Sequence, residues 1–282
     1  MKAGFNLLLW TSHVTEEHFP LIEKLARAGY DGVEIPILEG TPDYYGKIRR
    51  VVEDNGLACD VVTNMPDVLH NPISPDRKLR ERSREFMQRV IDCAHALGAD
   101  LVCGPFYQPV GLFTGIGPTD DEKKRAVEHA RVSAEHARPA GITLAVEFLN
   151  RFEAYFLTTM DGAAEHVAAV DMPNFKAMFD TFHANIEEAD PVASICRHGD
   201  IITHVHISEN NRGVPGRGHT DWTGIFKALR SADYNHWLTI EAFGRVLPAF
   251  AAATRIWRDI FESPEVLYTE GIAFIRRMWA AS

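Results

Sequence analysis

Strand-like and helical patterns alternate along the whole chain, and this alternation constrains the fold more than any other feature of the sequence. Short apolar, β-branched runs predict strands at 3–10, 31–37, 57–63, 99–105, 142–149, 175–181, 201–208 and 236–243. Helical spacing predicts helices at 15–29, 44–56, 76–97, 119–139, 160–169, 190–198, 222–231, 247–261 and 264–280. Eight βα units without a dividing linker predict one α/β domain over residues 1–282, a (β/α)8 TIM barrel with a C-terminal helical extension at about 262–282.

Composition and charge exclude several classes of protein. The 29 basic and 39 acidic residues give a net charge of −10, and the basic residues are scattered, so we expect neither nucleic acid nor a membrane as a partner. No apolar run approaches the roughly 20 residues of a membrane span, and the N-terminal residues lack a signal-peptide pattern. The four cysteines form no CxxC motif and lie in apolar segments, which predicts reduced core thiols and a cytoplasmic location. No GxGxxG or P-loop motif supports a nucleotide-binding fold.

Potential metal ligands fall at the ends of the last four predicted strands. They are Glu147, Asp180, His206 and Glu241. Successive members are separated by roughly one βα repeat of about 30 residues, so a barrel places all four at a similar height on one rim. His204 points the same way one layer lower, and we interpret it as a core residue or as a support for His206.

The chemistry of this set favours a divalent cation. Three carboxylates that converge without a counter-charge repel one another, and their pKa values rise. A set of three carboxylates and one imidazole, without thiolates, suits Mn²⁺, Mg²⁺ or Co²⁺ better than a structural zinc ion. Each residue taken singly is also consistent with a charged group on an exposed loop, but four at matching positions favour a metal site.

Four motifs in this region resemble a known family. They are EFLNRFE at 147–153, DTFHANIEE at 180–188, HVHISENNRGVPGRG at 204–218 and IEAF at 240–243. In this order they are similar to the D-tagatose 3-epimerase family, which includes the D-psicose (D-allulose) and L-ribulose 3-epimerases. That family lies within the xylose-isomerase-like barrel superfamily, and the resemblance extends through nearly the whole chain.

The resemblance implies roles for individual residues. The matching metal ligands are Glu147, Asp180, His206 and Glu241, and the metal in the family is usually manganese, with magnesium or cobalt accepted. Two of these ligands, Glu147 and Glu241, also match the acid and base. Three further residues match positions that contact the sugar, namely Glu153, His183 and Arg212.

The implied reaction inverts C3 of a free ketose such as D-tagatose, D-fructose, D-allulose or L-ribulose. A proton is removed from the carbon next to the carbonyl and returned to the opposite face, and a metal-bound enediolate is stabilised by Lewis-acid polarisation. Asn6 stands where many relatives have an aromatic residue, so we expect a more polar substrate contact there. Trp10, Glu34 and residues 105–113 are further candidates for the pocket lining, or else packing and surface residues.

Several alternatives remain open from the sequence. The same metal rim is compatible with an aldose–ketose or hydroxypyruvate-type isomerase, or with a dehydratase of inositol-like ketones. A phosphorylated substrate would need Arg212 or Arg217 to bind its phosphate. A non-catalytic sugar-binding barrel is a further possibility, whereas an endonuclease-IV-like site lacks enough rim histidines.

Local alternatives also remain for three of the proposed sugar contacts. His183 is also consistent with a cap of the following helix, and Arg212 and Glu153 with solvated loop residues. The apolar C-terminal helices indicate either packing on the barrel or an interface, and we expect a homodimer or homotetramer.

Overall fold

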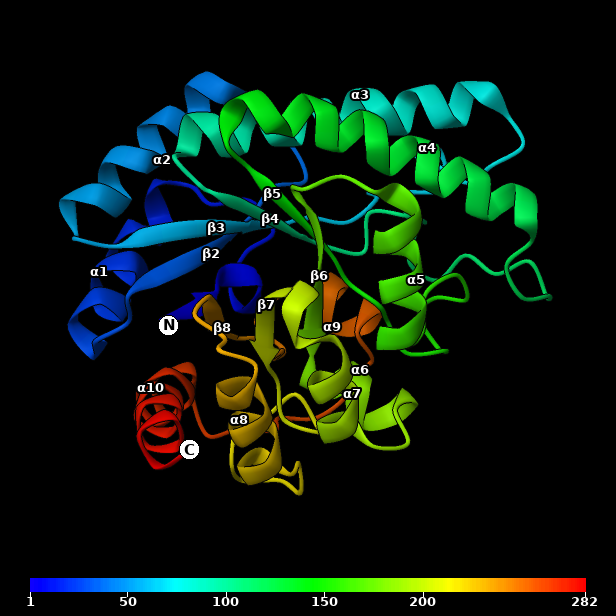
Figure 1. The fold of residues 1–282 in the computed structure, drawn as a ribbon. Helices are drawn as coiled ribbons and strands as arrows, with labels where there is room; N and C mark the ends of the chain where they lie inside the picture. The colour runs from blue at the N-terminus through cyan, green and yellow to red at the C-terminus, as the bar shows by residue number, and fades with distance from the viewer.

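Eight parallel strands form a closed barrel in the computed structural model, which describes residues 1–282. The strands pair in chain order, and the barrel closes where β1 pairs with β8 (Figure 1). Their bounds are β1 Lys2–Asn6, β2 Gly32–Pro36, β3 Ala58–Val62, β4 Leu101–Gly104, β5 Thr143–Val146, β6 Phe175–Asp180, β7 Ile202–Ile207 and β8 Trp237–Ile240. The predicted (β/α)8 fold is confirmed.

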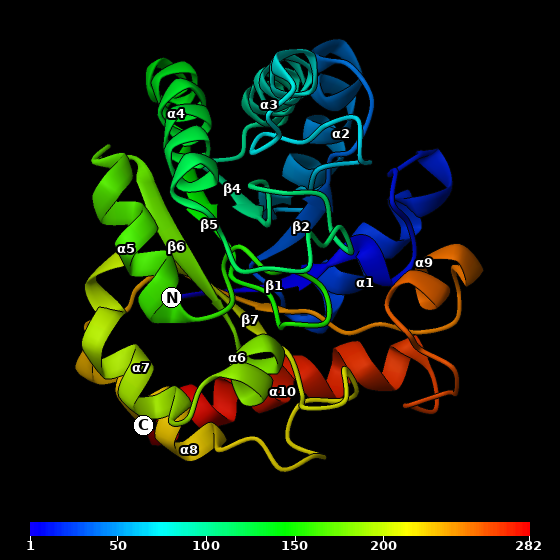
Figure 2. The ribbon, with the colours of Figure 1, turned by 90° about the vertical axis from the view of Figure 1, so that its right-hand side faces the viewer.

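Helices surround the barrel on its outside (Figures 1 and 2). They are α1 Phe19–Ala28, α2 Pro42–Asp54, α3 Arg77–Leu97, α4 Asp120–Ala137, α5 Met160–Val170, α6 Thr181–Glu187, α7 Pro191–His198, α8 Trp222–Ser231, α9 Pro248–Ala253 and α10 Pro264–Ala281. The expected C-terminal helix is present as α10, which packs on β1 and β8 and contacts both α1 and α8. None of these helices has the length and apolar character needed to cross a membrane.

The sheet separates two apolar clusters. The large one, 68 buried residues, includes Val33 and Val61 and fills the space between the strands and the helices. The small one inside the barrel contains only Val62, Leu101, Cys103, Ala145 and Met178. Trp237 also limits the space inside the barrel, because a Cβ atom on Gly32 would lie 2.4 Å from its ring. Much of the remaining interior is polar, and this polar interior leads up to the rim where the predicted ligands lie.

Local capping explains where several elements begin and end. The Asp76 side chain accepts a hydrogen bond from the Lys78 amide at the start of α3, and Gly98 ends that helix in the left-handed conformation, with φ 84°. Thr119 and Glu122 form a reciprocal capping box at the start of α4. These signals fix the helix ends close to the predicted boundaries.

Two predictions of local structure were wrong, and one helix was not predicted. The first strand ends at Asn6 rather than residue 10, because the Asn6 side chain accepts a hydrogen bond from the Leu8 amide and starts a 3₁₀ turn at Leu7–Leu9. The helix expected at 247–261 ends at Ala253, and the chain turns at Arg255, with φ 63°, so that Ile256 packs against Phe243. Helix α6 was not predicted as an element of its own.

The cysteine prediction was correct for three of the four residues. Cys59, Cys93 and Cys103 are buried and free, as expected of reduced core thiols. Cys196 is exposed on α7 instead. One face of α7 is buried, through Ser194 and Ile195, and Cys196 lies on the opposite face, toward solvent.

Two histidines packed beneath the helices are expected to make stability depend on pH. Burial lowers the pKa of His129 to about 3 and that of His166 to about 4. As the pH falls from about 6.5 toward these values, the unfolded chain takes up protons that the folded chain does not. The free energy of unfolding should then fall by up to about 1.4 kcal/mol per pH unit for each histidine.

The test is urea unfolding of His129→Leu between pH 7.5 and 4.5. The variant should lose stability less steeply than the parent below pH 6.5, because one of the two groups is gone. His95→Leu is the matched control, since His95 is exposed on α3 and its replacement should leave the slope unchanged. Equal slopes for His129→Leu and the parent protein would contradict this account.

Candidate active site

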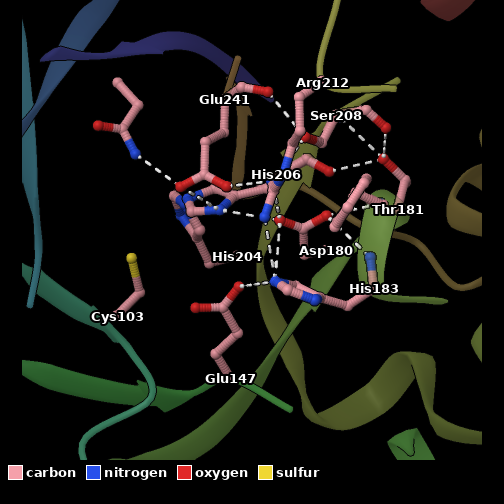
Figure 3. A network of polar contacts seen from close by, with 12 residues as sticks. Cys103, Glu147, Asp180, Thr181, His183, His204, His206, Ser208, Arg212 and Glu241 are labelled. Carbon is pink, nitrogen blue, oxygen red and sulfur yellow. Dashed lines mark hydrogen bonds and ion pairs between the residues drawn. The ribbon is translucent and has the colours of Figure 1, made fainter. Parts of the chain in front are cut away.

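The four predicted ligands meet on the carboxyl-terminal rim of the barrel. Asp180 is the last residue of β6 and pairs in register with His206 of β7, while Glu147 and Glu241 directly follow β5 and β8. All four are buried, and Figure 3 shows their side chains grouped together. Because each is held on or next to a barrel strand, the position of its side chain is fixed by the sheet rather than by a loop.

The imidazole of His206 lies at the centre of this group. Its Nδ1 atom is 3.6 Å from Asp180 Oδ2 and 3.4 Å from Glu241 Oε1. Ligand atoms of Glu147, Asp180 and His206 all lie within 4.8 Å of one another. His206 Nδ1 is fully buried, yet it has no hydrogen-bond partner. An unpartnered nitrogen facing carboxylate oxygens fits the ligand set of a divalent cation.

The concentrated negative charge perturbs the carboxylates in opposite directions. Burial raises the pKa of Glu147 well above its usual range, and Glu241 and Asp180 raise it further against the opposing effect of His206. Burial also acts to raise the pKa of Asp180, but Arg212 and His183 outweigh it and hold that pKa well below its usual range. The cluster therefore disfavours the ionised form of Glu147 unless further positive charge is present.

Arg212 is the buried cation of the site. Its Nη1 donates hydrogen bonds to Asp180 Oδ2 at 2.9 Å and to Glu241 Oε2, and its guanidinium lies over the rings of Phe182 and Phe243, at 4.0 and 4.5 Å from their centroids. Only 5% of Arg212 is exposed, so the alternative of a solvated loop residue is wrong. The structure brings Arg212 into direct contact with two of the predicted ligands.

A buried carboxylate that the sequence did not reveal organises the loop carrying Arg212. Glu209 accepts hydrogen bonds from the Gly216 amide at 2.7 Å, the Trp222 indole at 2.9 Å and the Thr220 hydroxyl at 2.7 Å. The loop bends closely around it: Arg212 adopts the left-handed conformation, with φ 62°. Hydrogen bonds to Glu209 thus hold in place the glycine-rich turn that carries Arg212.

His183 faces the same cluster from α6. Its Nε2 lies 3.6 Å from Glu147 Oε1, and its Nδ1 accepts a hydrogen bond from the Asn150 amide at 3.0 Å. His183 does not cap the following helix α7, because Asp190 does so by accepting from the Ala193 amide at 2.9 Å. His183 lies within α6, which Asp180 caps by accepting from the Phe182 amide at 2.6 Å. Asp180 therefore stabilises the helix with Oδ1 while its Oδ2 faces His206.

Glu153 approaches the cluster less closely. It is half-buried and accepts a hydrogen bond from the Asn150 side chain at 2.8 Å, so Asn150 lies between Glu153 and His183. Asn150 was missed in the sequence, where nothing distinguished it from other loop asparagines. The two residues expected to contact the sugar are thereby linked through a third.

The remaining pocket candidates occupy three different settings. Asn6 is buried and donates a hydrogen bond to Glu241 Oε1 at 3.0 Å. Trp10 is half-buried and packs on Phe5, with ring centroids 5.1 Å apart. Glu34 is fully buried one layer below the rim, where its Oε1 lies 2.9 Å from His206 Nε2. Of the three, Asn6 is thus the one in contact with the rim carboxylates.

Comparison with known proteins identifies the family. A family model for the xylose isomerase-like TIM barrel matches residues 22–278. The chain belongs to this family. It is 32% identical to a D-psicose 3-epimerase of Ruminiclostridium cellulolyticum, over 92% of this chain and 90% of that one. It is 30% identical to a probable ketose 3-epimerase of Synechocystis, over 99% and 97% of the two chains.

Solved structures agree with this assignment. A D-allulose 3-epimerase from Methylomonas in complex with D-allulose superposes with a TM-score of 0.93 at 26% identity, covering 99% of this chain and 97% of that one. An L-ribulose 3-epimerase superposes with a TM-score of 0.93 at 28% identity, covering 99% and 95%. The resemblance seen in the sequence is confirmed: the chain groups with the ketose 3-epimerases, which are carbohydrate isomerases.

The buried Glu209 carboxylate predicts a measurable contribution to stability. Replacing it in Glu209→Gln removes the charge and one accepting oxygen, which leaves buried donors of the loop unsatisfied. We expect the free energy of unfolding to fall by about 2–3 kcal/mol. Urea denaturation measures it, with Glu270→Gln as the matched control, because Glu270 makes only an exposed ion pair with Arg217 and should contribute less than about 1 kcal/mol. Equal effects of the two substitutions would refute the account of the loop.

Proposed function

We propose that this protein is a divalent-metal-dependent enzyme that inverts C3 of a free ketose in the cytoplasm. The observation that carries the proposal is the buried cluster of Glu147, Asp180 and His206, with Glu241 Oε1 3.4 Å from the unpartnered His206 Nδ1. A cation held by these four residues would supply Lewis-acid polarisation of the substrate carbonyl. The oxygen-rich donor set favours Mn²⁺, with Mg²⁺ or Co²⁺ as alternatives.

Glu147 and Glu241 are proposed to exchange the proton at C3. They follow β5 and β8, which are not neighbours in the barrel, so the two carboxylates extend toward the substrate from different directions. One carboxylate removes the proton while the other donates a proton to the opposite face, and the roles reverse for the back reaction. The hydrogen bond from Asn6 to Glu241 Oε1 keeps that carboxylate oriented.

His183 and Arg212 are proposed to stabilise the negative charge that develops on the substrate oxygens. Both are buried beside Glu147 and Asp180, and Arg212 Nη2 lies 3.1 Å from His183 Nε2, so the two side chains are held in position before the substrate binds. Glu153, connected to His183 through Asn150, is proposed to accept hydrogen bonds from substrate hydroxyls. Together these groups orient the sugar relative to the two catalytic carboxylates.

The substrate is proposed to be an unphosphorylated ketohexose or ketopentose, such as D-tagatose, D-fructose, D-allulose or L-ribulose. The relatives are named D-psicose, L-ribulose and ketose 3-epimerases. Arg217, one of the two candidates for phosphate binding, is exposed and pairs with Glu262 and Glu270. Arg212, the other, lies directly beside the Asp180 and Glu241 carboxylates, which would repel a phosphate group.

We also propose a homodimer or homotetramer. Most apolar residues of α10, including Phe274 and Ile275, pack within the barrel's helical layer, but Trp257 remains 68% exposed after α9. An exposed indole of this kind is typical of protein–protein contacts.

Isotope exchange tests the proposed reaction. Metal-loaded protein is incubated with each of the four ketoses in D₂O, and proton NMR follows the sugar. Deuterium should enter C3 together with the C3 epimer, and Glu147→Gln and Glu241→Gln should each lower the rate by at least about 100-fold. Glu265→Gln, on the exposed start of α10, is the control that should keep the parent rate. Deuterium at C1 with an aldose product would indicate an aldose–ketose isomerase instead.

Metal removal tests the proposed cofactor. A ligand that binds only the folded state at 100 times its dissociation constant stabilises a protein by about 2.7 kcal/mol. Adding Mn²⁺ at that level to chelator-treated protein should raise the melting temperature by roughly 5–10 °C, as measured by calorimetry. His206→Ala should abolish most of this rise. Identical melting curves with Mn²⁺ and with chelator would contradict a metal site in the folded protein.

A further inference from the structure

A layer of polar groups lies inside the barrel directly beneath the rim. Glu34 on β2, Asp60 on β3, Cys103 on β4 and His204 on β7 have no exposed surface. Glu34 and Asp60 are paired in register on adjacent strands. Carboxylates are strongly disfavoured in such a setting unless other groups satisfy them, so their presence here calls for a specific interaction.

Glu34 makes that interaction with His206. His206 Nε2 lies 2.9 Å from Glu34 Oε1 and 3.2 Å from Oε2, in hydrogen-bonding geometry with both. A carboxylate oxygen can only accept, so Nε2 carries a proton. The other ring nitrogen, Nδ1, lies 3.6 Å from Asp180 Oδ2 and 3.4 Å from Glu241 Oε1, and it would present its lone pair to a cation bound among them.

Other buried groups hold Glu34 in place. The Cys103 thiol donates a hydrogen bond to Glu34 Oε2 at 3.2 Å, and His204 Nε2 lies 2.8 Å from the same oxygen. His204 Nδ1 is in turn 3.2 Å from Asp60 Oδ2. Figure 3 shows His204 and Cys103 close to His206, on the side away from Arg212. The Glu34 carboxylate is thus restrained by contacts from two other strands.

We propose that Glu34 is a positioning residue for the metal centre, which holds the His206 imidazole with its proton on Nε2 and its Nδ1 lone pair aimed at the cation. This inference rests on the proposed role of His206 as a metal ligand. Carboxylates that accept from a ligating histidine fix its tautomer and orientation, and their loss weakens metal binding. Glu34 itself would make no contact with metal or substrate.

The residues around Glu34 are also close enough to hold an ion themselves, since ligand atoms of Glu34, Cys103, His204 and His206 lie within 4.8 Å of one another. The direct contacts favour the positioning role. Glu34 already receives two donors in hydrogen-bonding geometry, from His206 and Cys103, at distances where no ion separates them. A second ion at this place is therefore the competing outcome in the experiment.

The experiment measures Mn²⁺ binding to the whole protein by electron paramagnetic resonance, which detects free Mn²⁺. In Glu34→Gln, the amide can present an N–H group to the imidazole, so the Nε2–H arrangement is no longer enforced. We expect the dissociation constant to rise by about 10–100-fold. Glu39→Gln is the matched control, because Glu39 is an exposed glutamate shortly after the same strand, and its dissociation constant should stay within about threefold of the parent value.

A second measurement needs no variant. In the Mg²⁺-loaded parent protein, nitrogen-15 NMR of the histidine rings should show His206 protonated at Nε2 and not at Nδ1. Protonation at Nδ1, or an unchanged dissociation constant in folded Glu34→Gln, would overturn the inference. So would two bound Mn²⁺ per chain of which Cys103→Ser loses one. Failure of the parent protein to bind any Mn²⁺ would instead overturn the proposed function and with it this inference.

Discussion

Mutual repulsion among buried carboxylates is the constraint on which this structure depends. Glu147, Asp180 and Glu241 are brought together at one end of the barrel, where water can do little to screen them. In the protein alone, Arg212 supplies compensating charge to Asp180 and Glu241, and burial raises the pKa of Glu147. A cation bound among these groups would complete the neutralisation and release Glu147 to act as an ionised base. The convergence of these carboxylates therefore underlies both the need for a cation and the proposed catalysis.

The fold holds these charged side chains in a fixed geometry. The ligands are attached to strands β5 to β8, which hydrogen bond to one another in sequence, so their relative heights follow from strand register. The loop that delivers Arg212 would be free to move without Glu209, whose carboxylate binds three separate parts of it. Below the rim, apolar packing gives way to the polar layer that contains Glu34. Stability is supplied mainly by the apolar cluster outside the sheet, which leaves the interior available for polar groups.

The sequence predicts the barrel and the rim because both follow from periodicity. Glu147, Asp180, His206 and Glu241 each recur at a strand end, and parallel strands place such positions on one edge. Features that depend on contacts between distant segments were not predictable in this way. Glu34 is an isolated acid in the sequence, and its partner His206 lies 172 residues away. Asn6 donates its hydrogen bond to Glu241, 235 residues away, and after α9 ends at Ala253 the chain turns so that Ile256 joins a small apolar cluster with Phe243.

The central claim is that the carboxylates of the rim enclose one cation. Anomalous diffraction from crystals grown with Mn²⁺, collected at the manganese absorption edge, tests it most directly. The account predicts a single strong peak per chain among Glu147, Asp180, His206 Nδ1 and Glu241, with Arg212 drawn away from the carboxylate oxygens that bind the ion. A peak at Glu34 and Cys103 instead, or no peak among the rim carboxylates, would contradict it.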